Sequence, residues 1–358
     1  MGRLYIQSPS EQVAAHLREQ LLSGEIEGRM PGTPLLSERL GVDRKTIIAA
    51  LNLLGQEGLL AAQGAGKRRR IMVPEGRVGA RQLKVAILLY QKGERNERAM
   101  LGLRYQLREA GFGAFFASRA LRELKLDVGK VDKMVKENDA DAWVVVSGSR
   151  EVLQWFSEQT HPVFALYGRH LRLAIAASGP SKSAAITEAV KRLAGLGHRR
   201  IVYLVREERR KPEPGLLERS FLSALEDCGI QTGAFHLPDW EDNRAGFHRM
   251  LDSLFRHSPP TAMIVDTAPL FAAARDHLAS KGIIAPRHVS LICTDPDASF
   301  EWCEPAVSHF RWDPSDCIRH VVRWAENIAH GKDDRRKNQS KAEFVEAGTV
   351  GTADFYKR

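Results

Sequence analysis

Apolar residues near the start of the chain recur at helical spacing. Val13, Leu17 and Leu21 repeat every four residues, which predicts a helix with one apolar face. Ser8 and Glu11 stand where a capping box would begin that helix, with a proline between them at the first helical position. We therefore expect an amphipathic helix that ends near Gly24.

Two further helices follow, separated by a tight turn. The first is short, with Thr33 expected as its cap, and it ends at Gly41. Asp43 can cap the next helix, whose buried stripe consists of Ile47, Leu51 and Leu54. Two helices joined by such a turn are typical of a helix-turn-helix.

A short hairpin is predicted directly after these helices. Residues 59–62 and 70–73 read as two strands, and the turn between them holds Gly64, Gly66 and a basic run. A hairpin in this place is a wing. The polar stretch 74–82 contains proline and glycine, so we interpret it as a linker.

From residue 83 onward, apolar strands alternate with amphipathic helices. This alternation predicts parallel sheets with helices on both faces, and the segment is long enough for two such lobes. The predicted fold class is α/β, with a winged helix in residues 1–73, a linker in 74–82 and a two-lobed domain in 83–358. The predicted strands are 85–90, 113–117, 142–147, 163–167, 201–205, 262–265 and 289–294.

The charge of the chain indicates what kind of partner it binds. The formal net charge is +9, and residues 1–82 carry four of those nine charges although they are less than a quarter of the chain. Such a balance favours an anionic partner. Four dispersed cysteines and the lack of a long apolar run predict a cytoplasmic protein with reduced thiols.

The basic residues of the winged helix are the candidate DNA contacts. The second helix of a helix-turn-helix enters the major groove with its N-terminal end, here Arg44, Lys45 and Thr46. Arginine and lysine can reach guanine edges or phosphates, and threonine a phosphate or a thymine methyl group. A basic run alone is as often a solvated surface as a DNA contact. A basic run directly after a helix-turn-helix, however, favours DNA binding. The wing candidates are Gly64, Gly66, Lys67, Arg68, Arg69 and Arg70.

Residues 11–73 resemble the GntR family of winged-helix regulators. The resemblance rests on Ser23-Gly24, on Met30-Pro31-Gly32, on the segment Gly41–Thr46, and on Glu57-Gly58-Leu59-Leu60. It assigns the family's recognition arginine to Arg44. A second arginine of the family falls on Ile48, so one usual contact is missing here.

Residues 83–352 resemble the LacI/GalR-type effector domains, which share the periplasmic-binding-protein fold. The segments 189–201, 260–262 and 282–295 carry the resemblance. It assigns an effector-binding aspartate to Asp295, with Asp266 on the neighbouring strand end. Tyr90 and Ser147 also end predicted strands, where open α/β sheets bind ligands. Aromatic residues at Tyr167, Trp240, Trp302 and Trp312 could line the same cleft, whereas Trp143, Trp155 and Trp324 fit a core.

We therefore expect a homodimeric regulator that binds operator DNA and a sugar-like effector, with no enzyme activity and no cofactor. Two alternatives remain: a sugar-processing enzyme with a basic N-terminal module, and a DNA-packaging protein without a ligand. No catalytic motif supports the first, and the second does not need a cleft. Cys303, His309, Cys317 and His320 do not have the spacing of a zinc site.

Overall fold

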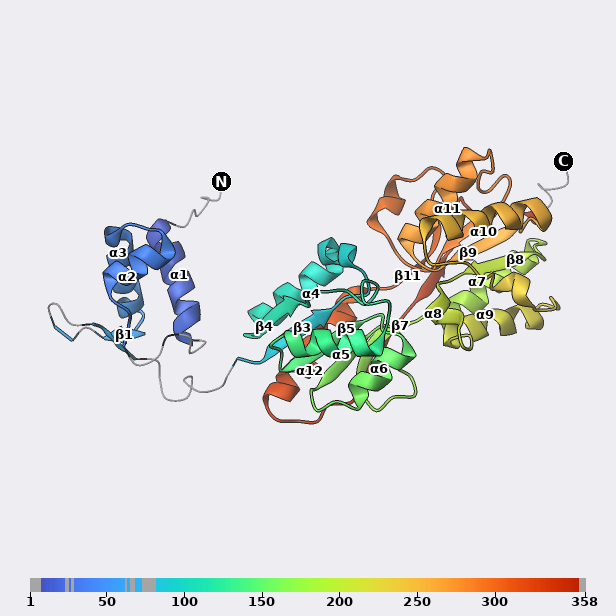
Figure 1. Cartoon of the computed structure of the whole chain (residues 1–358). Helices are drawn as coiled ribbons and strands as arrows, with labels where there is room; N and C mark the ends of the chain where they lie inside the picture. Colours follow the sequence, from blue (N-terminus) through green and yellow to red (C-terminus); the bar gives the residue numbers. More distant parts are fainter. Residues whose placement is uncertain are drawn as a thin grey trace. The chain divides into compact units, whose positions relative to one another are not determined.

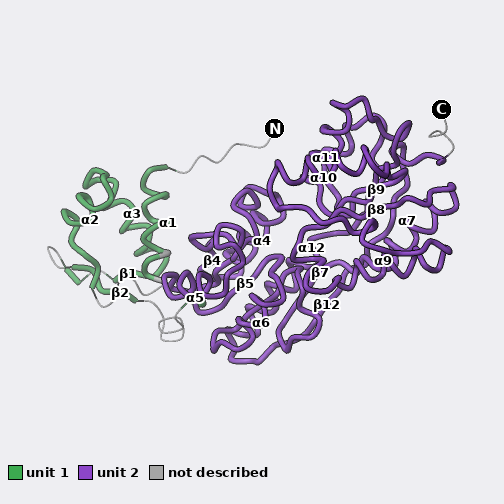
Figure 2. The backbone as a smooth tube through the Cα atoms, turned by 45° about the vertical axis from the view of Figure 1, so that its right-hand side comes forward, with its two compact units in different colours: residues 1–83 green, residues 84–358 purple. Residues whose placement is uncertain are grey.

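A computed structural model describes residues 8–22, 26, 29–61, 63–64, 68–72 and 82–353 of the chain (Figure 1). The chain divides into two compact units, residues 1–83 and 84–358, which are coloured separately in Figure 2. None of the helices among the described residues is both long and apolar enough to cross a membrane.

The first unit is built on the helices α1 (Pro9–Leu22), α2 (Thr33–Leu40) and α3 (Arg44–Gln56). Leu17, Ile47 and Leu54 are fully buried between them. The predicted capping box is confirmed: the backbone N–H of Ser8 donates to Glu11 Oε2 at 2.7 Å, and that of Glu11 donates to Ser8 Oγ at 3.3 Å. The predicted end of α1 at Gly24 lies outside the described residues.

The turn between α2 and α3 has the glycine end and the aspartate cap that the sequence predicts. Gly41 has a φ of 67°, which suits glycine, and the Asp43 carboxylate accepts the backbone N–H of Thr46 at 3.0 Å. The prediction that Thr33 caps α2 is wrong. The N–H of Leu36 bonds the carbonyl of Gly32 at 3.1 Å, so the helix begins one residue earlier and Gly32 is its cap.

The predicted hairpin is present. Strand β1 (Leu60–Ala61) pairs antiparallel with β2 (Arg70–Ile71), and Arg29 forms an isolated bridge to Arg70. Gly66 and Lys67 of the predicted turn, and residues 74–81 of the predicted linker, lie outside the described residues.

The second unit contains two lobes. Lobe 1, defined as residues 84–181 and 314–341, holds a parallel six-stranded sheet in the order β12-β7-β6-β5-β3-β4. Its elements are β3 (Lys84–Leu88), η1 (Lys92–Asn96), α4 (Arg98–Glu109), β4 (Gly113–Phe116), α5 (Val128–Glu137), β5 (Ala142–Val146), α6 (Arg150–Ser157), β6 (Val163–Leu166), β7 (Ala176–Ser181), α12 (Pro314–Ala329) and β12 (Lys337–Lys341).

Lobe 2, defined as residues 183–311 and 343–353, holds a five-stranded sheet in the order β13-β11-β10-β9-β8, in which only β13 is antiparallel. Its elements are α7 (Ser183–Gly195), β8 (Ile201–Leu204), α8 (Glu207–Arg210), α9 (Leu216–Asp227), η2 (Ala234–His236), α10 (Arg244–His257), β9 (Ala262–Val265), α11 (Ala268–Ser280), β10 (Ser290–Cys293), η3 (Ala298–Trp302), β11 (Ser308–Arg311) and β13 (Glu343–Val345).

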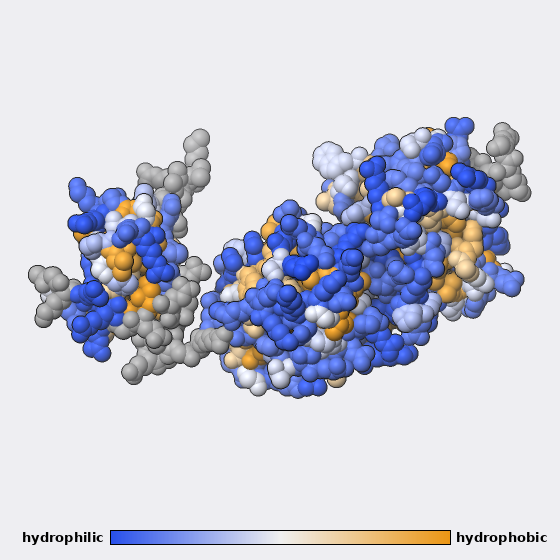
Figure 3. All heavy atoms as spheres, viewed as in Figure 1, coloured by the Kyte–Doolittle hydropathy of each residue, from blue (hydrophilic) through white to orange (hydrophobic). Residues whose placement is uncertain are grey.

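Alternation along β8 shows why the strands of lobe 2 are apolar throughout. Ile201 and Tyr203 join one core cluster, which includes residues of α7 and α9, while Val202 and Leu204 join another, which includes residues of α10 and α11. Both faces of the sheet are therefore covered, as expected for parallel strands. The exterior is mostly hydrophilic in the view of Figure 3.

The chain crosses between the lobes three times, after β7, after β11 and after β12. All seven predicted strands are confirmed, and so is the α/β fold class with parallel sheets. The predicted list of strands omitted β7, β11, β12 and β13, three of which (β7, β11 and β12) end at the crossings.

Candidate functional sites

A cleft of about 1800 Å³ lies at the facing ends of the two lobes. Its walls include the residues that follow the carboxyl ends of several strands of both sheets, which is where open α/β sheets bind ligands. The structure places all four predicted effector residues on this one cleft: Tyr90 and Ser147 from lobe 1, and Asp266 and Asp295 from lobe 2.

The lobe 1 wall carries two residues in a left-handed backbone conformation. Ser147 has a φ of 51° and Tyr167 a φ of 65°, each directly after its strand. Each is followed by a glycine, and a Cβ on Gly168 would lie 2.6 Å from the carbonyl oxygen of Gly148. Strained backbone of this kind persists only where surrounding structure holds it, and it is common at ligand sites.

A buried charge network forms the lobe 2 wall. The guanidinium of Arg209 lies 2.9 Å from Glu218 Oε1 and 3.6 Å from Asp266 Oδ1. The hydroxyl of Tyr203 donates to Asp266 at 3.3 Å, and that of Thr294 donates to the Asp266 carbonyl at 2.5 Å. Asp266 is thus held in place directly after β9, and it lines the cleft.

Acidic groups from both lobes meet near the crossing after β7. Lys182 Nζ donates to Asp295 Oδ1 at 2.5 Å and lies 5.7 Å from the centre of the Trp312 ring. Burial, together with the negative charges of Asp295 and Asp297, raises the pKa of Glu97. Burial, together with the charge of Glu97, raises the pKa of Glu94 to about 7.

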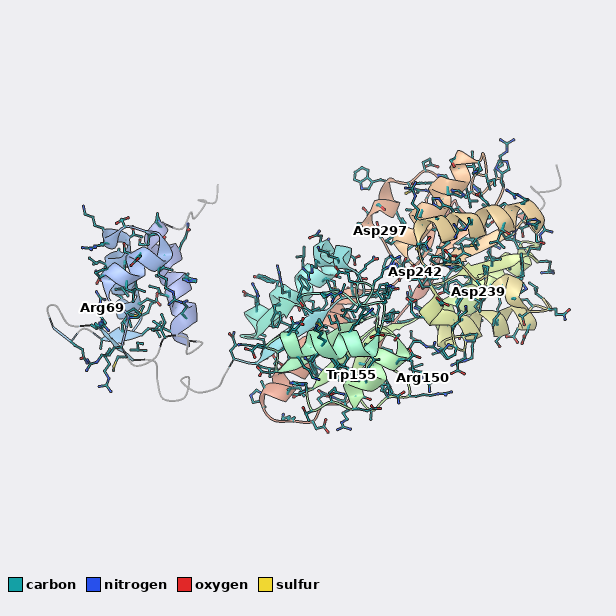
Figure 4. The ribbon with its side chains drawn as sticks, in the orientation of Figure 1. Arg69, Arg150, Trp155, Asp239, Asp242 and Asp297 are labelled. Atoms are coloured by element: carbon teal, nitrogen blue, oxygen red, sulfur yellow. The ribbon has the colours of Figure 1, made fainter. Side chains whose placement is uncertain are left out.

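Polar contacts also join the lobes directly. The Tyr90 hydroxyl donates to Asp242 Oδ2 at 3.4 Å, and Arg122 donates to the Asp242 carbonyl at 2.7 Å (Figure 4). The guanidinium of Arg206 stacks 4.5 Å above the centre of the Tyr90 ring. Tyr90 is therefore held between two side chains of lobe 2, and burial raises the pKa of its hydroxyl.

Arg169 supplies the second direct connection. This lobe 1 side chain donates to three backbone carbonyls of lobe 2, those of Glu208, Lys211 and Glu213, at 3.0–3.1 Å. Arg150 adds an ion pair with Glu213 at 3.4 Å. These contacts hold the two lobes together at this edge of the cleft.

Several buried polar atoms on the cleft wall have no hydrogen-bond partner in the protein. Buried polar groups are almost always paired in folded proteins, so such a group of atoms indicates that the partners come from a ligand or from water. The atoms are Arg206 Nε, Glu218 Oε2, Thr267 Oγ1, Trp312 Nε1 and His170 Nδ1. The described residues contain no cluster of three His, Cys, Asp or Glu that could hold a metal ion.

In the first unit, the N-terminal turn of α3 presents a basic surface. Arg44 and Lys45 are exposed. The Thr46 hydroxyl donates to Asp43 Oδ2 at 2.6 Å, so it serves the helix cap. Asp43 is exposed as well, and its hydrogen bonds to Thr46 lower the pKa of its carboxyl, so this turn carries one negative and two positive exposed charges.

The arginines of the hairpin differ in their surroundings. Arg68 and Arg70 are exposed. Arg69 is half-buried, and its guanidinium donates to the Leu51 carbonyl at 2.5 Å and to Asn52 Oδ1 at 2.6 Å (Figure 4). Arg69 therefore ties β2 to α3, a role that its place in a basic run does not reveal.

Comparison with known proteins identifies both parts. Residues 9–67 match the profile of the bacterial regulatory proteins of the gntR family, and residues 190–349 match that of a periplasmic binding protein-like domain. The chain joins a gntR-type domain to a periplasmic binding protein-like domain. It thus has the two parts of a transcription regulator, a DNA-binding domain and an effector domain. Curated protein sequences give no significant match.

Solved structures show the same fold for the larger part. The transcription regulator CcpA of Lactococcus lactis is 13% identical with a TM-score of 0.63, over 75% of this chain and 100% of that one. The transcriptional regulator CelR in complex with cellobiose is 16% identical with a TM-score of 0.61, over 89% and 100%. The lac repressor dimer bound to operator is 12% identical with a TM-score of 0.59, over 78% and 99%.

Within the second unit, the predicted aromatic residues separate into two groups. Tyr167 and Trp312 line the cleft with Tyr90. Trp240 does not: it is buried against Phe247, and its Nε1–H donates to the Val205 carbonyl at 2.9 Å. Trp302 is 87% exposed and is not part of the cleft wall.

Apart from Asp266 and Asp295, sequence reasoning missed the charged side chains of this cleft. None of them stands in a recognisable motif, and α8, which carries Arg209, has only four residues. The missed residues are Glu94, Arg169, Lys182, Arg206, Arg209 and Glu218. A cluster of arginines directly after a strand, at 206, 209 and 210, was the signal available.

Proposed function

We propose that this chain is a transcription regulator whose affinity for operator DNA changes when a carbohydrate-like effector binds in the cleft. The effector contacts Tyr90, Ser147, Asp266 and Asp295. The observation that carries the proposal is the cleft itself, which gathers all four residues and the unpaired buried atoms beside them. Hydroxyl groups both donate and accept, so a polyol suits this mixture of donors and acceptors.

The gntR-type domain supplies the DNA contacts in this proposal. Arg44, Lys45 and Thr46 enter the major groove, and the hairpin from Gly64 and Gly66 through Lys67, Arg68, Arg69 and Arg70 follows the phosphate backbone. The exposure of Arg44 and Lys45 supports this arrangement. Arg69 acts by fixing the hairpin rather than by touching DNA.

A homodimer on an inverted repeat completes the proposal, because one winged helix covers only a short half-site. The similarity to a repressor solved as a dimer on its operator supports this. A protein that sediments as a monomer at micromolar concentration and footprints on single half-sites would contradict it.

The effector is tested with the full-length chain. A thermal-shift screen against monosaccharides and disaccharides, with turnover of each hit measured, should give a stabilising sugar that is not consumed. Operator binding with and without that sugar should differ by about 5–150-fold, the usual range of allosteric coupling. Turnover would instead favour a sugar-processing enzyme.

The DNA contact is tested by Arg44→Ala. Loss of a base contact costs about 1–3 kcal/mol and relaxes specificity at one position. Unchanged affinity and unchanged specificity would overturn the assignment of Arg44.

A further inference from the structure

One large apolar side chain lies on the outer face of α3. Ile48 is 47% exposed, whereas Ile47, Leu51 and Leu54 of the same helix are buried in the core. It stands four residues after Arg44 and four before Asn52, so these three side chains form one stripe along the helix. Apolar surface shows among hydrophilic surface over α2 and α3 in Figure 3.

A single exposed isoleucine is common and by itself indicates nothing. The charged residues beside Ile48 indicate which kind of partner it would contact. Arg44 and Lys45 are exposed on the same turn, and both oxygens of the neighbouring Asp43 are bound to Thr46. Two exposed cations against the one carboxylate of Asp43 give this turn a net positive charge, which matches a polyanion that also offers an apolar group.

The far end of the stripe is fixed in place. Asn52 Oδ1 accepts a hydrogen bond from Arg69 at 2.6 Å, which orients the amide and ties it to the hairpin. Ile48 thus lies between an exposed cation at Arg44 and an amide at Asn52 that is held by Arg69. Its χ1 is restricted by β-branching, so it presents a stiff apolar surface.

We propose that Ile48 reads the 5-methyl group of a thymine in the major groove. This methyl is the apolar group that base pairs expose there. Four residues along a helix span about 6 Å, and base pairs are about 3.4 Å apart, so the thymine should lie about two base pairs from the one that Arg44 contacts. The proposal rests on the proposed function, because it requires α3 to enter the groove.

Operators are first selected from a random duplex pool with the full-length protein. The selected sites should contain an invariant T·A pair about two positions from the pair whose identity depends on Arg44. Replacing that thymine by deoxyuridine removes only the methyl group and should weaken binding about fourfold, the effect of exposing one buried methylene.

Two variants sharpen the test. In Ile48→Ala the deoxyuridine substitution should have no further effect, since the partner of the methyl is gone. Ile48→Arg should select a G·C pair at that position, because arginine pairs with guanine edges. Ile284→Ala, which removes a side chain of similar exposure from lobe 2, should select the wild-type site.

The outcomes separate the two proposals. If the wild-type protein enriches no sequence, sequence-specific DNA binding fails and the thymine contact fails with it. If it enriches a site that depends on Arg44, yet every deoxyuridine substitution is neutral, the role of Ile48 is wrong while the proposed function stands. The deoxyuridine test on wild-type protein needs no variant to fold.

Discussion

Lys182 and Asp295 form a 2.5 Å ion pair at the point where the chain leaves lobe 1 for lobe 2. Lys182 follows the last residue of β7, and Asp295 follows the carboxyl end of β10. The Lys182 side chain is only 12% exposed and that of Asp295 27%. The pair therefore links a crossing segment to a cleft-lining carboxylate, so a ligand that contacts Asp295 lies directly beside this crossing between the lobes.

Asp295→Asn should abolish the effector response while leaving effector-free operator binding near normal. The amide cannot neutralise the buried ammonium of Lys182, so the free energy of unfolding should also fall by about 1–3 kcal/mol. Urea denaturation and operator titrations measure the two effects. The control is Asp276→Asn, which removes an exposed pair with Arg275 and should change stability by less than about 0.5 kcal/mol. A full effector response in Asp295→Asn would mean that the effector binds elsewhere.

Arg169 should control the opening of the cleft. Its three hydrogen bonds to lobe 2 carbonyls need the planar guanidinium, so Arg169→Lys keeps the charge but not the geometry. Hydrogen exchange at residues 208–215 should become about tenfold faster, as expected when charge-assisted bonds are lost. Arg172→Lys, an exposed arginine on the same cleft, is the matched control. Equal exchange rates in the two variants would contradict this role.

The strands were predictable from sequence because parallel strands buried on both faces read as continuous apolar runs. Val144, Ile264 and Ile292 are all fully buried members of such runs. The missed strands lack this signal. Strand β7 has the sequence Ala-Ala-Ser-Gly-Pro-Ser and β12 has Lys-Asn-Gln-Ser-Lys, and their pairing with each other is set by tertiary structure.

The four effector residues that sequence reasoning placed in the cleft, Tyr90, Ser147, Asp266 and Asp295, all follow apolar strands. Their place in the cleft follows from the rule that strand carboxyl ends gather at one edge of a sheet. Arg169 and Arg206 were missed because their roles depend on which loop of the other lobe lies opposite. Trp240 was misplaced for a similar reason: its sequence position in a loop did not show that Val205 and Phe247 would enclose it.

Glu94 should make stability depend on pH. Its pKa is about 7 in the folded protein and ordinarily about 4.5, so the unfolded chain loses this proton first as the pH rises. Stability should therefore fall between about pH 4.5 and pH 7. Glu94→Gln should remove about 1–2 kcal/mol of that fall. This is less than the full pKa difference would give, because Glu94 is partly exposed to solvent. The substitution preserves an acceptor, because a single oxygen of Glu94 receives the N–H groups of Tyr90 and Gln91.

Unfolding free energies of both proteins at pH 5 and pH 7.5 measure this effect. The pKa of buried His170 is lowered to about 4, so His170 contributes the opposite trend below about pH 6.5. Both proteins contain His170, and their difference therefore isolates Glu94. Parallel pH profiles would show that Glu94 ionises normally.

Arg70, the first residue of β2, and Arg69, directly before it, should differ in how they affect DNA binding. Arg70 is exposed, so Arg70→Ala should lower operator affinity and reduce the salt slope by about one, as for a lost phosphate contact. Arg69 is bound to Leu51 and Asn52, so Arg69→Ala should weaken binding equally at all salt concentrations and leave the slope unchanged. It should also destabilise the gntR-type domain by about 1 kcal/mol, since the partly buried Leu51 carbonyl loses its donor. Operator affinity measured from low to high salt distinguishes the two roles, and a reduced slope in Arg69→Ala would place its guanidinium on a phosphate instead.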